Sequence, residues 1–136
     1  MSLAFWGDNH RQLFDPAAPS VGSRMEAIRF LRKEDLAVHL RIDPLFPRDV
    51  LPGGKRMEDF GLPDVQPLSD LDSLVRFCGE VGIGQIIYSV AKITQPRDGR
   101  LSTVMGRMKQ VYEHLSPKGS RRNRRGFRLA RVRIGR

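Results

Sequence analysis

The sequence contains only one cysteine, Cys78, among its 136 residues. A disulfide within the chain is therefore excluded, and so is any zinc or iron–sulfur site built from several thiolates of this chain. Cys78 lies on the apolar stripe of an expected helix, where a buried, inert thiol is far more common than a nucleophile. The histidines show no metal-ligand spacing with Cys78 or with one another; they are His10, His39 and His114. We expect a structural cysteine and no metal site.

Long apolar runs are missing as well. No run approaches the roughly 18 residues that a membrane-spanning helix needs. The apolar stretch before Gly7 is too short for a secretory signal and lacks its basic flank. Together with the lone cysteine, these absences predict a cytoplasmic protein with no membrane partner.

Acidic residues are absent from the C-terminal end. The chain has 24 basic and 15 acidic residues, which gives a net charge of +9. Residues 116–136 contain nine basic residues and no acidic one, so the remainder carries 15 residues of each sign. We therefore expect a neutral body over residues 1–115 and a basic, flexible tail over residues 116–136.

The tail suggests a nucleic-acid partner, either DNA or RNA. Arginine neutralises phosphates and releases counterions, and an aromatic ring can stack on a base. The candidate nucleic-acid-binding residues are Arg121, Arg122, Arg124, Arg125 and Phe127. The alternative is that an arginine-rich terminus binds polyanions without a selected role.

Hydrophobic spacing predicts an alternation of strands and helices. Asp8 is placed to cap a helical turn through Phe14, and Ser20 and Ser69 to cap longer helices. The expected strands are 2–5, 38–43, stopped by Pro44, and 85–93; the expected helices are 20–33, 69–82 and 101–115. This order is typical of an α/β fold of repeated βα units with parallel strands. Three units make about half of a TIM-like barrel, so the chain is too short to close one.

Three stretches carry a resemblance to a known family. Residues 15–20 (DPAAPS) precede the helical segment 24–31 (RMEAIRFL), residues 41–47 read RIDPLFP, and residues 70–82 lead into the strand that begins at Gln85. Over residues 1–115 the chain resembles the C-terminal barrel half of spore photoproduct lyase and related DNA-repair radical SAM proteins. In that family a proline-rich segment precedes a helix of the form R-x-E-A-I-x-x-L, and the next strand ends in R-I-x-P-x-x-P.

The resemblance implies a partial radical SAM barrel. A complete member would hold a [4Fe-4S] cluster and S-adenosylmethionine, and would reverse thymine cross-links in DNA by radical chemistry. Its C-x-x-x-C-x-x-C cluster motif has no counterpart in a chain with one cysteine, so we expect neither cofactor to be bound by this chain alone. The chain would be a fragment of a lyase, inactive by itself, whose partner is the missing N-terminal half or a second copy. The alternative is a small basic nucleic-acid-binding protein that is not an enzyme.

One strand carries the candidate ligand-binding residues. His39, Arg41 and Asp43 form its polar face, which would line the lumen of a barrel, and the last two stand at its carboxyl end, where barrel enzymes keep their active sites. They could bind S-adenosylmethionine or substrate; a solvated face or a structural ion pair are the alternatives. Ser89 and Lys92 lie at the end of the next strand on opposite faces, and we favour Lys92. The predicted binding residues are therefore Arg41, Asp43 and Lys92, and no residue is assigned as catalytic.

Overall fold

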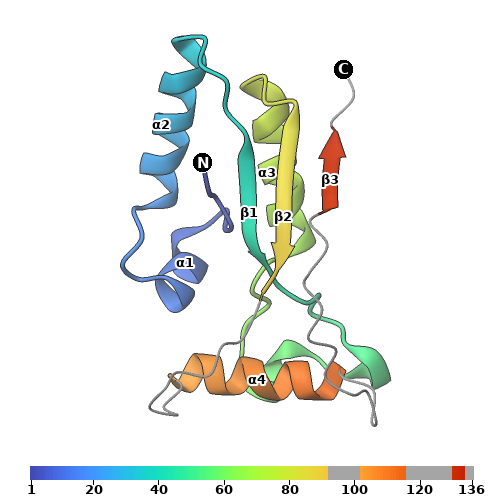
Figure 1. Ribbon diagram of the computed structural model, residues 1–136. Helices are drawn as coiled ribbons and strands as arrows, with labels where there is room; N and C mark the ends of the chain where they lie inside the picture. The colour runs from blue at the N-terminus through green and yellow to red at the C-terminus, as the bar shows by residue number, and fades with distance from the viewer. Residues whose placement is uncertain (92–101, 116–129, 134–136) are drawn as a thin grey trace.

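The computed structural model describes residues 1–91, 102–115 and 130–133. The helices are α1 (Asp8–Phe14), α2 (Val21–Lys33), α3 (Leu68–Glu80) and α4 (Thr103–Leu115), with 3-10 helices η1 (Pro52–Gly54) and η2 (Met57–Phe60) (Figure 1). The strands are β1 (Leu40–Leu45), β2 (Gln85–Val90) and β3 (Ala130–Arg133). The three longer helices and two of the expected strands are therefore confirmed, and the fold is of the α/β class.

The sheet has the order β1-β2-β3. β1 and β2 are parallel, with Leu40 opposite Ile86, whereas β3 runs antiparallel to β2. The expected strand over residues 2–5 is reduced to a single parallel bridge between Ser2 and Arg41. A sheet strand within residues 116–136 was not expected. The other residues of that segment lie outside the described ranges. The boundary predicted at residue 116 is therefore not tested.

The predicted strand end at Pro44 and the predicted helix cap at Ser69 are both wrong. Pro44 does not stop β1, which runs on to Leu45 through an irregularity in its pairing with β2. Such an irregularity accommodates a residue that has no N–H to donate to the ladder. Ser69 does not cap α3, because the helix begins one residue earlier, with Pro67 at the N-cap position and no side-chain cap.

Of the other two predicted helix caps, the one at Ser20 is confirmed and the one at Asp8 is wrong. The Ser20 side chain accepts a hydrogen bond from the Ser23 amide at 3.1 Å and so caps α2. Asp8 does not cap α1; its carboxylate accepts from the amide of Val21, the first residue of α2, at 3.0 Å. Gly82 follows the end of α3, and its φ of 73° is the left-handed conformation that a glycine adopts without steric cost.

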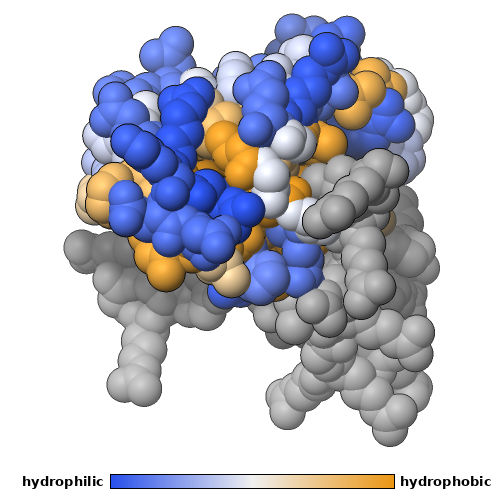
Figure 2. Space-filling view, turned by 90° about the horizontal axis from the view of Figure 1, so that it is seen from above, coloured by the Kyte–Doolittle hydropathy of each residue, from blue (hydrophilic) through white to orange (hydrophobic). Residues whose placement is uncertain are grey.

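Helices cover one face of the sheet. Leu40, Ile42 and Ile86 of the strands pack against Ile28 of α2 and against α3, whose contribution includes Phe77. Figure 1 shows α3 behind β1 and β2 and α2 beside β1, while no helix of the described ranges covers the opposite face. Seen along the strands from their amino ends, hydrophilic residues surround a band of apolar ones (Figure 2). Within the described residues, one face of the sheet is therefore left without a covering helix.

A second core forms beyond the carboxyl ends of the strands. α4 crosses there (Figure 1). It buries Met108 and Val111 against Met57 and Leu62 of the irregular segment that joins β1 to α3. That segment is therefore packed, although its prolines and glycines predict only loop structure.

Gln66 joins these parts and is only 6% exposed. Its Nε2 donates to the carbonyls of Ala4 and Pro44 at 2.7 and 2.9 Å, and its Oε1 accepts from the Phe46 amide at 2.8 Å. One side chain therefore satisfies three backbone groups in two segments far apart in sequence.

We predict that Gln66→Ala lowers the free energy of unfolding by about 2–4 kcal/mol, because it leaves three backbone groups without their partner. Urea denaturation should give a lower midpoint with an unchanged slope. Gln110→Ala, at an exposed position of α4, is the matched control and should change the midpoint little. Equal midpoints for the two variants would contradict this role of Gln66.

Candidate ligand-binding site at the carboxyl ends of the parallel strands

A polar cluster lies on the open face of the sheet. Arg41 and Asp43 are two residues apart on β1 and therefore point to the same face. Their side chains form an ion pair with Nη2 and Oδ2 2.7 Å apart. The Ser89 hydroxyl of the neighbouring strand donates a hydrogen bond to the other oxygen of Asp43. The structure thus brings two of the predicted residues together and adds Ser89.

The ion pair contributes little to stability. The Arg41 and Asp43 side chains are 53% and 33% exposed. Exposed pairs of this kind contribute about 0–1 kcal/mol, since solvent screens the charges. The pair expected as one alternative therefore exists, but stability alone does not explain a polar cluster at this position.

The other predicted binding residues are not tested. Lys92, which we favoured over Ser89, lies outside the described residues, as do the five candidates of the tail. Ser89 was passed over because the sequence fixes which residues share a face, but not which face of β2 meets Asp43. Only the register, with Ile42 opposite Tyr88, places Ser89 beside it.

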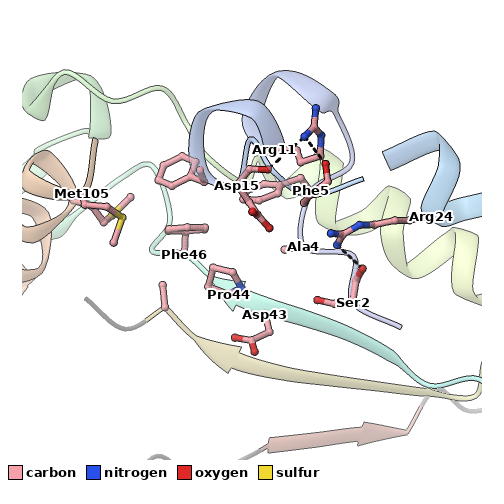
Figure 3. A pocket seen from close by; sticks show the side chains of 14 residues that line it. Ser2, Ala4, Phe5, Arg11, Asp15, Arg24, Asp43, Pro44, Phe46 and Met105 are labelled. Carbon is pink, nitrogen blue, oxygen red and sulfur yellow. Dashed lines mark hydrogen bonds between the residues drawn. The ribbon is translucent and has the colours of Figure 1, made fainter. Parts of the chain in front are cut away.

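A cavity of about 360 Å³ opens where β1 and β2 end. β1 contributes Asp43 and Pro44, and Ala91 follows β2 directly. The far side is formed by α4, from which Met105 faces the cavity (Figure 3). Known pockets for small ligands measure roughly 300–1,000 Å³, so the space suits a compact organic molecule.

Aromatic rings form one wall of the cavity. Phe5, Phe14 and Phe46 come from the N-terminal segment, the end of α1 and the residue after β1. The ring centroids of Phe14 and Phe46 are 4.7 Å apart, and each lies 6.0 Å from that of Phe5. Such a wall offers apolar, polarisable surface to a flat ring of a ligand.

Arg11, among the charged groups at the cavity, is committed to the protein itself. Its Nε donates to Asp8 at 2.6 Å, and Nη1 donates to the Ala18 carbonyl at 2.8 Å. The amide of Val21 and then the Arg11 guanidinium lower the pKa of Asp8. Arg11 therefore holds the loop after α1 in place.

Arg24 and Asp15 have fewer hydrogen bonds and ion pairs to the described residues than Arg11 has. Arg24 donates through Nη1 to the Ser2 carbonyl at 2.8 Å, and no carboxylate of the described residues pairs with it. The Asp15 side chain has no hydrogen-bond or ion-pair partner among the described residues, and Figure 3 shows its carboxylate at the cavity. Both residues belong to stretches that carry the family resemblance, yet no pattern in the sequence assigns them to a site.

The residues do not fit an iron–sulfur cluster. Cys78 lies on the buried side of α3 and is fully buried in the core, and burial raises the pKa of its thiol to about 11. Cluster ligands are thiolates, which this environment disfavours. Over the described ranges no three histidine, cysteine, aspartate or glutamate side chains are grouped to hold a metal ion.

We predict that Cys78 of the folded protein does not react with a thiol-specific disulfide reagent at pH 8. With a pKa of about 11, only about one thiol in a thousand is ionised at that pH. Concentrated guanidinium chloride should restore full reactivity, which can be followed by absorbance. Rapid labelling of the folded protein would contradict the buried position.

Comparisons with known proteins give no similarity from which to interpret this site. No family model, no curated protein and no solved structure matches the chain. In the structure itself, none of the described helices is both long and apolar enough to cross a membrane. The interpretation of the cavity therefore depends on its own residues.

Proposed function

We propose that the chain is the C-terminal part of a radical SAM lyase resembling spore photoproduct lyase, which acts on DNA and is inactive without its cluster-bearing half. One observation carries the proposal. Asp43 stands at the carboxyl end of a parallel strand and lines a cavity of ligand size. Barrel enzymes, and open α/β sheets in general, bind their ligands at this end of the strands.

In this proposal S-adenosylmethionine, and not the cluster, would occupy the cavity. The phenylalanine wall would pack against the adenine ring, and the Asp43 carboxylate would face the positive charge of the sulfonium group. Bound there, the cofactor would supply the carbon–sulfur bond that radical SAM chemistry cleaves. The cluster itself would come from another polypeptide, because Cys78 is buried away from the cavity wall.

The proposed partner is the missing N-terminal barrel half, with a second copy of the chain as the alternative. The open face of the sheet, which carries Arg41 and Ser89, would line the lumen of the completed barrel. A partial TIM-like barrel requires such a face. The antiparallel β3 would then lie outside the parallel repeat.

We predict that the isolated chain binds S-adenosylmethionine in isothermal titration calorimetry, and that Asp43→Asn weakens this binding about tenfold. The substitution removes a charge while keeping a similar shape, and a charge-assisted contact is worth roughly 1.5–3 kcal/mol. Asp72→Asn is the matched control, since Asp72 pairs with Arg76 on α3 and does not line the cavity. Absence of binding, or equal losses in both variants, would refute the proposal.

The alternative function is nucleic-acid binding by the basic tail, without catalysis. The observation in its favour is that the tail supplies the whole net charge of +9. Deleting residues 116–136 is a poor test, because it also removes β3, the neighbour of β2 in the sheet. Substitutions that spare β3 are needed instead.

We predict that replacing Arg121, Arg122, Arg124 and Arg125 together by glutamine weakens DNA binding and flattens its dependence on salt. Each lost phosphate contact lowers the slope of log affinity against log salt by about 0.9. The control replaces four exposed cations of the body by glutamine; these are Lys33, Arg48, Lys55 and Lys109. The tail has no such role if both variants show the wild-type slope in fluorescence anisotropy.

A further inference from the structure

Arg24 differs from the other cations near the cavity in how few of its N–H donors have a partner among the described residues. A guanidinium has five N–H donors in a planar fork. Arg11 uses its donors on Asp8 and on backbone carbonyls of the loop that follows α1. Arg41, on the sheet, is paired with Asp43. Arg24 has one hydrogen bond, to the Ser2 carbonyl, and no ion pair within the described residues.

The position of Arg24 is fixed by rigid elements. It lies on the first turns of α2, a helix capped by Ser20, and its bond to Ser2 ties it to the segment that bridges to β1. The side chain is half-buried at the cavity, and Figure 3 shows it reaching from α2 toward Ser2. A partly desolvated cation with free donors binds an anion more strongly than one in bulk water.

We infer that Arg24 is the anion-binding residue of the cavity, and that its ligand is a flat unsaturated ring carrying a phosphate or a carboxylate. The ring packs on Phe5, Phe14 and Phe46, and the anionic group receives two N–H bonds from the guanidinium fork. Asp15 offers an acceptor to N–H groups of the ring. The inference rests on the proposed function in one respect: the ligand occupies the cavity that is proposed there for S-adenosylmethionine.

Three probes that share one ring test the inference by calorimetry. Adenosine carries no anion, adenosine 5′-monophosphate adds a phosphate, and S-adenosylhomocysteine adds a carboxylate together with an ammonium group. At least one of the two anionic probes should bind about 10- to 100-fold more tightly than adenosine, as expected for a charge-assisted pair. The probe that shows the gain identifies the anionic group.

Arg24→Gln should abolish that gain and leave the affinity for adenosine unchanged. Arg24→Lys, which keeps a donor for Ser2 but loses the planar fork, should retain part of the gain and guards against a folding defect. Lys33→Gln removes one positive charge from the same helix, away from the cavity, and should behave as wild type. Equal affinities for the three probes, or a gain that survives in Arg24→Gln, would overturn the inference.

The outcomes separate this inference from the proposed function. If S-adenosylmethionine binds in an Asp43-dependent way but neither anionic probe gains over adenosine, the function stands and the role of Arg24 is wrong. If the anionic probes gain through Arg24 but S-adenosylmethionine does not bind, the anion site stands and the proposed function is wrong.

Discussion

The side-chain amide of Gln66 holds together the walls on which the candidate site depends. Its three hydrogen bonds end on Ala4, Pro44 and Phe46, and all three of these residues line the cavity. An amide that is 6% exposed can be tolerated only when its donors and acceptor are used, and here they are. The shape of the cavity and the packing of the second core are therefore linked through one residue.

The two faces of the sheet have different tasks. The face covered by α2 and α3 supplies the larger apolar cluster, which includes Cys78 and Phe77. The other face carries Arg41, Asp43 and Ser89, which are bonded to one another but remain partly accessible. Burial on one side provides the stability that allows polar groups to remain on the other.

The three arginines around the cavity differ in the groups to which they donate hydrogen bonds. Arg11 holds a loop, Arg41 is paired on the sheet, and Arg24 donates, among the described residues, only to the Ser2 carbonyl. Residue type alone does not distinguish these three arginines. Their distances to carboxylates and carbonyls do, and those distances depend on how α1, α2 and the N-terminal segment pack.

The sequence by itself determined the alternation of helices and strands from α2 to α4 and the burial of Cys78, because these follow from local periodicity and from glycine and proline positions. It also placed Arg41 and Asp43 on one face, since that depends only on the two-residue repeat of a strand. Only the tertiary structure decided that Ser89 meets Asp43, that Gln66 bridges Ala4 to the end of β1, and that Arg24 reaches the cavity. Strand register and long-range packing fix these contacts, and neither leaves a signal in the neighbouring sequence.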